Sequence, residues 1–306
     1  MAYRHAAAKD RAIGALLGLA TGDAVGTTLE FRPRDSYPPL SDMVGGGPFR
    51  LSPGQWTDDT AMALALADTL AQATNFDEQD LLARFTDWWL NGTYSCTGTC
   101  FDIGITTQQA LRKWLAEKAA HCGSTDPDTA GNGSLMRLAP VPIRYFNDPV
   151  RLNDVASRQS KTTHAAPEAV SACVAYCELI ADAINGMPKE EVLKPRSGDY
   201  AGQIKSIMSG QWRRKSREEI KSSGYVAHSL EASLWCVDQT ENFGDAVLLA
   251  ANLGHDADTT AAITGQLAGA LYGADGIPQN WLERLAWRDK IEEKAAILFR
   301  IATTES

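Results

Sequence analysis

The segment NLGHDADTTAAITGQLAGALYG, residues 252–273, places two acidic residues directly before an apolar helical pattern. Gly265, Gly269 and Gly273 recur at four-residue spacing and therefore share one face of the helix predicted over residues 258–272. A glycine inside a helix costs roughly 1 kcal/mol relative to alanine, so three of them on one face require a compensating contact. We predict that this helix packs unusually close against a neighbouring element.

Helical periodicity extends over most of the chain. Apolar residues at three- and four-residue spacing predict helices over residues 8–22, 59–73, 77–90, 103–121, 164–185, 227–238, 243–253, 258–272 and 286–302. The intervening segments are rich in Gly, Pro and Ser, and the alternation typical of strands is hard to find. These patterns predict an all-α protein with long functional loops.

The composition and net charge indicate which classes of partner the protein is expected to bind. The 306 residues are 44% hydrophobic and 22% charged, which is ordinary for a soluble globular protein. The net charge is -9, from 29 Lys and Arg against 38 Asp and Glu, and it argues against nucleic acid and anionic membranes as partners. A phosphate-bearing ligand would have to be held locally, by a metal or by backbone amides.

The N-terminal sequence and the cysteine spacing indicate in which cellular compartment the protein is expected. Residues 1–26 faintly resemble a secretory signal, but charged residues open the apolar run and no clean cleavage site follows it. No apolar stretch is expected to approach the ~20 residues of a membrane span. The spacings Cys96/Cys100 and Cys173/Cys177 fit neither a zinc knuckle nor a redox motif. The prediction is free thiols in a reducing cytoplasm.

A second acidic pair resembles the first one. Thr57-Asp58-Asp59-Thr60 begins the apolar segment 59–73, much as Asp256-Ala257-Asp258-Thr259-Thr260 begins the segment 258–272. Such residues can cap a helix and interact with its dipole. Capping, however, needs only one or two of them at each helix start. If the two starts face each other, four carboxylates converge, and hard cations such as Mg²⁺ or Mn²⁺ would relieve their repulsion. Four carboxylates suffice for two ions about 3.5–4 Å apart.

Five ordered motifs resemble the ADP-ribosylglycohydrolase family. They are GALLGLATGDAVGTTLEF (14–31), GQWTDDTAMALALADTL (54–70), GNGSLMRLAPV (131–141), SKTTH (160–164) and the opening segment. The resemblance spans roughly residues 10–275, and its style is that of the bacterial dinitrogenase reductase-activating and ADP-ribosylarginine hydrolase type. It implies a single domain over residues 1–306, with a compact all-α fold and a binuclear Mg²⁺ or Mn²⁺ site in a central cleft. The implied metal ligands are Thr57, Asp58, Asp59, Asp256, Asp258 and Thr259.

The resemblance also assigns catalytic candidates, namely Glu30, Asp102 and Asp258. Taken alone, Glu30 could be an ordinary surface acid. Asp102 could simply be the N-cap of the helix predicted to follow it. Which carboxylate acts as general base stays open, as does the choice between direct displacement and opening of the ribose ring.

The implied substrate-binding residues are Asn132, Gly133, Ser134, His164 and Tyr225. The sequence GNGS is expected to lead into a helix and to form a backbone-amide cradle for pyrophosphate or ribose, although a plain turn fits as well. His164 is either a cap or part of the cleft wall. Tyr225 either stacks on adenine or covers the core as a surface aromatic.

The expected function is metal-dependent removal of mono-ADP-ribose from a protein side chain, with arginine favoured as the acceptor. Alternatives are serine-linked, polymeric or O-acetyl ADP-ribose as substrate, or a non-catalytic binding or structural role. The expected partner is an ADP-ribosylated protein. An immunity role would add an ADP-ribosyltransferase toxin. Residues 186–226, rich in Lys and Arg, either contact the modified protein or form a solvated charged face.

Overall fold

The computed structural model describes residues 2–72 and 75–304, and this part of the chain is helical with no strand. The α-helices are α1 (Ala2–Gly26), α2 (Asp58–Gln72), α3 (Glu78–Asn91), α4 (Ile105–Glu117), α5 (Pro140–Tyr145), α6 (Pro149–Thr163), α7 (Pro167–Ile184), α8 (Lys189–Val192), α9 (Gly202–Met208), α10 (Val226–Asp238), α11 (Phe243–Ala251), α12 (Ala257–Tyr272), α13 (Gln279–Arg284) and α14 (Arg288–Thr304). Short 3₁₀ helices are η1 (Thr27–Leu29), η2 (Pro127–Thr129), η3 (Gln211–Arg214) and η4 (Ala274–Gly276). The predicted all-α class is confirmed.

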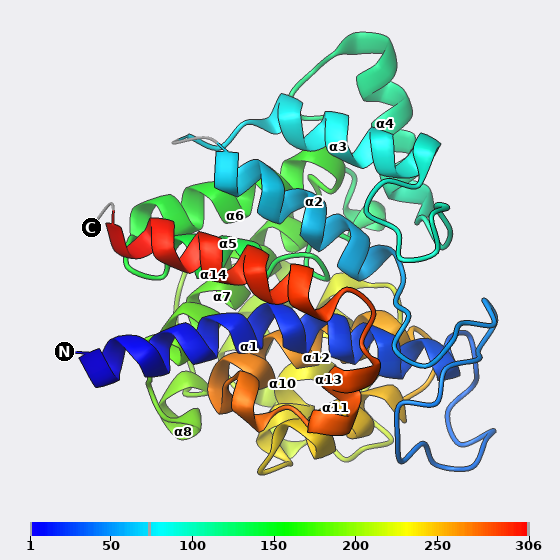
Figure 1. Cartoon of the computed structure of the whole chain (residues 1–306), viewed down its shortest axis with the longest axis vertical. Helices are drawn as coiled ribbons and strands as arrows, with labels where there is room; N and C mark the ends of the chain where they lie inside the picture. Colours follow the sequence, from blue (N-terminus) through cyan, green and yellow to red (C-terminus); the bar gives the residue numbers. More distant parts are fainter. Residues whose placement is uncertain (1, 73–74, 305–306) are drawn as a thin grey trace.

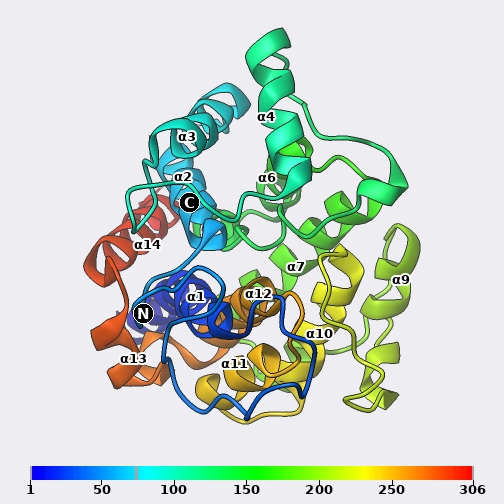
Figure 2. The ribbon, with the colours of Figure 1, turned by 90° about the vertical axis from the view of Figure 1, so that its right-hand side faces the viewer.

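Helices α1 and α12 form the centre of the molecule and lie side by side (Figures 1 and 2). Their glycines meet at the contact: a Cβ added at Gly18 would lie 2.2 Å from the Gly265 carbonyl oxygen, and one at Gly269 would lie 1.9 Å from that of Gly14. No side chain fits at such a distance, so glycine is required on both helices. The predicted close neighbour of the 258–272 helix is therefore α1.

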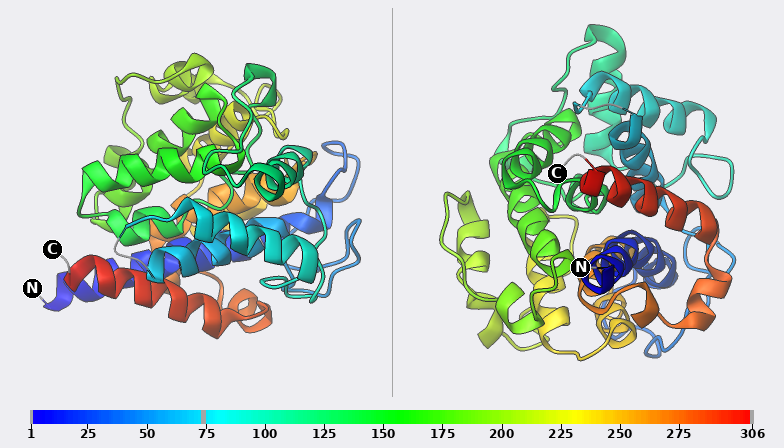
Figure 3. Two further views of the ribbon diagram at one scale, coloured as in Figure 1. Left: turned by 90° about the horizontal axis from the view of Figure 1, so that it is seen from above. Right: turned by 60° about the vertical axis from the view of Figure 1, so that its left-hand side comes forward.

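The other helices surround this central pair. Figure 2 shows α11 and α13 on one side of it and α2 and α3 on the other, with α10 beside α12. Helix α14 packs on both α1 and α2. The start of α1 and the end of α14 lie at the same end of the molecule (Figure 3), where the rings of His5 and Phe299 are 5.0 Å apart. The acidic helix starts lie at the opposite end of α1.

Helix α1 corrects the prediction that no apolar stretch approaches the length of a membrane span. By length and composition the region His5–Leu29 could cross a membrane, with a mean hydropathy of 1.3. In the structure, 94% of the 18-residue apolar window within this region is buried inside the protein. The length and apolarity of α1 follow from its central position, where most of its faces contact other helices.

Other helix predictions also differ from the structure. Helix α6 was not predicted, because its buried face is largely polar and includes Gln159, Ser160 and Thr162. The GNGS segment does not lead directly into a helix: residues 132–137 form turns, and α5 begins at Pro140. The helix predicted over 103–121 is shorter, since α4 runs from Ile105 to Glu117.

Candidate functional site

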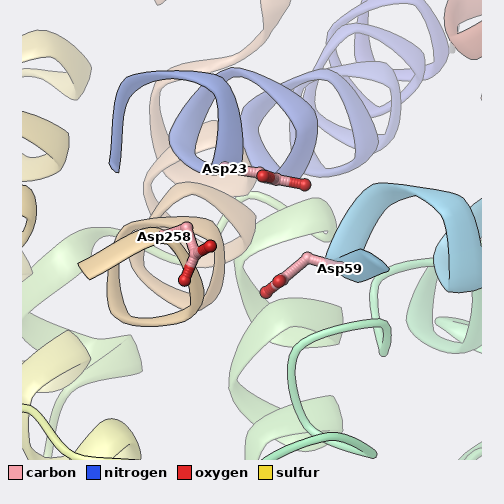
Figure 4. Close-up of side chains that lie close together, drawn as sticks. All are labelled: Asp23, Asp59 and Asp258. Carbon is pink, nitrogen blue, oxygen red and sulfur yellow. The ribbon is translucent and has the colours of Figure 1, made fainter. Parts of the chain in front are cut away.

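The starts of α2 and α12 face each other beside the end of α1. Figure 4 shows Asp23 of α1, Asp59 of α2 and Asp258 of α12 pointing toward one another. One carboxylate oxygen from each lies within 4.8 Å of the others, and Glu30, Asp256 and Asp258 form a second such group. The two acidic segments, about two hundred residues apart, are thus brought together as the sequence predicts.

Asp23 caps α2 from another helix. Its carboxylate accepts hydrogen bonds from the backbone N–H groups of Thr57 (2.9 Å) and Thr60 (3.1 Å) and from the hydroxyl of Thr60 (2.6 Å). This buried acid satisfies the first-turn N–H of Thr60 and the N–H of Thr57 just before the helix. These capping bonds of α2 come from α1, and neither Asp58 nor Asp59 supplies them.

Glu30 caps α12 in the same way. Its Oε2 accepts from the backbone N–H groups of Ala257 (2.7 Å) and Asp258 (3.3 Å). Asp256 occupies the N-cap position but makes no side-chain capping bond. Glu30 is only 4% exposed, so the interpretation of Glu30 as an ordinary surface acid is wrong. Capping therefore accounts for only part of the acidic set: Asp258 Oδ1 accepts from the backbone N–H of Thr259 (2.7 Å), and Glu30 supplies the other capping bonds of α12.

Mutual repulsion and burial dominate the electrostatics of the cluster. Burial, followed by neighbouring carboxylates, raises the pKa of Asp258 to about 7 and that of Asp102 to about 9. The pKa of Glu30 is raised by burial and then by Asp258, and the pKa of Asp59 by burial and then by Asp23. A pocket that raises the pKa of so many acids together favours a positively charged occupant.

The donor set fits a hard divalent cation. Among the described residues, Asp59 Oδ1 and Asp258 Oδ2 are buried without a hydrogen-bond partner. The Thr259 hydroxyl lies 3.4 Å from Asp59 Oδ2 and 3.5 Å from Asp258 Oδ1. Unpartnered carboxylate oxygens with a threonine hydroxyl among them are an all-oxygen set of the kind that Mg²⁺ or Mn²⁺ prefers.

The cluster opens into a cleft of about 570 Å³. The predicted site residues that line it are Glu30, Asp58, Asp102, Asn132, Gly133, His164, Asp256, Asp258 and Thr259. Thr57 and Asp59 lie behind this surface, where the Thr57 hydroxyl is 3.3 Å from Asp59 Oδ2. Ser134 is also buried away from the cleft, 2.8 Å from the Ser160 hydroxyl.

Asp102 reaches the cleft from an unusual backbone conformation. Its φ is 59°, in the left-handed region that non-glycine residues rarely adopt. The N-cap of α4 is Gly104, so the prediction that Asp102 caps this helix is wrong. The turn directs the carboxylate toward Asp258 instead, and strained backbone of this kind is concentrated at functional sites.

The wall of the cleft beside Asp256 contains two paired segments and a neutral histidine. Asn132 N donates to Gly224 O (3.0 Å), and Val226 N donates to Ala130 O (3.0 Å). His164 packs against this wall: a Cβ at Gly133 would lie 2.7 Å from its ring. Burial, followed by the charge of Arg137, lowers the pKa of His164 to about 3, so the imidazole is uncharged.

Asn132 and Tyr225 have specific partners in this wall. The Asn132 amide donates to Asp256 (2.7 Å) and Ser229 (2.8 Å), so it orients an acid of the cluster. Tyr225 is half-buried and is not among the cleft-lining residues; its hydroxyl donates to Glu168. Its position beside Gly224 is at the edge of the cleft, and stacking on adenine stays a prediction.

Sequence reasoning missed Asp23, which lies in ATGDAVG within the most apolar helix of the chain. It is fully buried, and burial raises its pKa to about 6. A lone acid inside an apolar helix is costly unless it is paired, and this mismatch was the available signal. Its partners lie some 35 residues away, so local pattern alone could not identify them.

Comparisons with known proteins agree with this geometry. The ADP-ribosylglycohydrolase family model matches residues 4–306. The chain is 50% identical over 95% of its length to ADP-ribosylarginine hydrolase Tri1 of Pseudomonas putida (strain GB-1), covering 78% of that protein. It is 34% identical to the ADP-ribosyl-[dinitrogen reductase] glycohydrolase of Rhodospirillum rubrum, over 90% of each chain. A solved structure titled "ADP-ribosylglycohydrolase-related protein complex" superposes with a TM-score of 0.86 at 38% identity, covering 96% of this chain and 99% of that one.

Proposed function

The chain belongs to the ADP-ribosylglycohydrolase family, and from that premise we propose that it hydrolyses the bond between mono-ADP-ribose and an arginine side chain. The observation that carries the proposal is the pair of facing acidic helix starts at the base of a cleft. The acceptor is suggested by the Tri1 relatives, two ADP-ribosylarginine hydrolases that are 50% and 46% identical to this chain.

We assign the metal ligands to the residues of the two acidic segments and the hydroxyls beside them. They are Thr57, Asp58, Asp59, Asp256, Asp258 and Thr259. Two Mg²⁺ or Mn²⁺ ions held there would supply the positive charge that orients ribose hydroxyls and activates water. Asp23 positions Thr57 and the start of α2, and Asn132 positions Asp256, so that both stabilise the ligand geometry.

The residues of this chain perform the remaining tasks. The reaction breaks the bond from the anomeric carbon to the guanidine nitrogen, attaches the water oxygen to that carbon and returns a proton to the guanidine. Asp102 and Glu30 line the cleft beside Asp258, and this position makes them the candidates to give or accept a proton in the reaction. The cleft wall that contains Gly131, Gly133 and Gly224 has no side chains at these positions, so the pyrophosphate could approach the backbone there.

The biological context is a further part of the proposal. We infer that the enzyme acts in the cytoplasm, which is supported by six cysteines that are all free thiols. Reversal of ADP-ribosylation would protect a cell from an arginine-modifying toxin, so an ADP-ribosyltransferase that modifies arginine is the partner to test.

The test is release of free ADP-ribose from an arginine-linked substrate, compared with a serine-linked substrate, with and without Mg²⁺ or Mn²⁺. We expect metal-dependent release from arginine. Release from serine alone would move the proposal to another linkage. No release from either substrate by metal-loaded protein would favour a non-catalytic role.

A further inference from the structure

An exposed apolar rim borders the acidic end of the cleft. We define the rim as Phe31, Phe49, Phe101 and Ile105. Phe31 is 63% exposed and Ile105 is 77% exposed, and both line the cleft. The ring of Phe49 joins the other two, with centroids 6.1 Å from Phe31 and 5.1 Å from Phe101. Phe49 and Phe101 are half-buried and support the exposed Phe31. An exposed apolar cluster at the mouth of a cleft is typical of binding surfaces.

The backbone holds the rim in position. Phe31 has a φ of 61°, a conformation that is rare for a bulky residue. Its N–H donates to His255 O (2.7 Å), and His255 N donates to Arg32 O (2.7 Å). This pairing fixes the segment to the loop before α12, so the exposure of Phe31 is a property of the folded chain.

The rim is attached to the groups assigned to catalysis. Phe31 follows Glu30 directly, Phe101 precedes Asp102 directly, and Ile105 begins α4. The other wall of the cleft consists of the glycine segments, His164 and the buried Met136, and it meets the acids at Asp256; the exposed apolar side chains that line the cleft are those of Phe31 and Ile105. The rim therefore adjoins the end of the cleft where the bond is broken.

This inference rests on the proposed function. In its substrate, two groups extend from the bond that is broken, and we call them the ADP arm and the polypeptide arm. The ADP arm needs a wall of backbone amides, which the segments around Gly131, Gly133 and Gly224 offer. The other arm is the arginine and the polypeptide that carries it. With the ribose at the acids and the ADP on the glycine wall, the polypeptide leaves the cleft over the rim.

We propose that the apolar rim binds apolar side chains next to the modified arginine, and so selects among ADP-ribosylated polypeptides. Burying an exposed phenylalanine and isoleucine against a partner favours Leu or Phe beside the arginine over Ser or Gly. On this proposal the rim contacts the polypeptide and not the ADP-ribose.

The experiment compares two arginine-ADP-ribosylated peptides of equal length, one with leucines and one with serines beside the modified arginine. The wild-type enzyme should show kcat/KM about tenfold higher for the leucine peptide. In Phe31→Asn and Ile105→Ser this ratio should fall to near one. Asparagine is chosen because it tolerates positive φ, and serine because it is accepted at a helix start. Val150→Ser, at an exposed apolar residue of α6 outside the cleft, should leave the ratio unchanged.

Binding separates this inference from the proposed function. The same peptides are titrated into Asp102→Asn protein, which keeps all the assigned metal ligands, with and without the rim substitutions, so that the substrate survives. We expect tighter binding of the leucine peptide only with the rim intact, and equal binding of free ADP-ribose in all variants. If wild-type enzyme released no ADP-ribose, the proposed function would fail, and this titration would still decide the role of the rim. Equal affinity for both peptides, or an equal loss for free ADP-ribose, would overturn the inference.

Discussion

The carboxylate of Asp23 accepts a 2.6 Å hydrogen bond from the hydroxyl of Thr60, which ties the end of α1 to the first turn of α2. The same carboxylate accepts from the backbone N–H of Thr57. An acid that the local pattern of the sequence does not reveal thereby positions one of the two segments that we assign to the metal.

Replacement of Asp23 by alanine should weaken metal binding. Without the carboxylate, the start of α2 loses its cap and Thr57 loses its partner, so we expect the affinity for Mn²⁺ to fall about 10- to 100-fold. Calorimetric titration measures it. Asp77→Ala is the matched control, because Asp77 caps α3 through Gln79 N and Asp80 N in an exposed position. Unchanged affinity in Asp23→Ala would show that Asp23 has no positioning role.

Replacement of Asp258 by asparagine should have opposite effects with and without metal. In chelator-treated protein it removes a buried charge from a repelling cluster, and the free energy of unfolding should rise by about 1–3 kcal/mol. The stabilisation by Mn²⁺ and the release of ADP-ribose should both be lost. Thermal unfolding with and without Mn²⁺ checks this, with Asp245→Asn in the exposed first turn of α11 as control. Full turnover in Asp258→Asn would contradict the metal assignment.

Replacement of Gly18 by alanine should destabilise the protein. The added methyl would lie 2.2 Å from the Gly265 carbonyl oxygen, so α1 and α12 must separate, at a cost of about 1–3 kcal/mol. Chemical denaturation measures the loss. Gly104→Ala is the comparison, because the nearest atom to its added Cβ is 4.0 Å away. If both variants were equally stable, the close approach of the helices would not depend on glycine.

His164 should make folding sensitive to acid. Its pKa is about 3 in the folded chain and about 6.5 when unfolded, so between these values only the unfolded chain binds the proton. The contribution to stability is therefore complete above pH 6.5 and is lost as the pH falls toward 3, by up to about 1.4 kcal/mol per pH unit. The measurement is the difference in unfolding free energy between wild type and His164→Gln from pH 7 to pH 4. Because both proteins share the carboxylates, a difference independent of pH would mean that folding does not lower the pKa of His164.

The sequence predicts those features whose cause is local. The glycines of residues 258–272 indicated a close neighbour, and the two acidic segments indicated facing helix starts. What could not be predicted depends on partners distant in the chain. Helix α6 buries Gln159 and Ser160 because Arg137 and Ser134 hydrogen-bond to them, and no periodicity of apolar residues records this. The sequence leaves Asp102 as either a cap or a cleft residue, because the left-handed turn that directs it to the cleft depends on the folded structure.

The pairing of α1 with α12 also bears on how the chain is made. The apolar surface of α1 is synthesised before the glycine face that covers it, which lies more than 230 residues later in the chain. At a translation rate of about 5–20 residues per second, this surface stays without its partner for roughly 12–50 seconds. An apolar helix of 25 residues therefore waits for its partner during that time, and a chaperone that shields α1 until α12 is made would protect the nascent chain from aggregation.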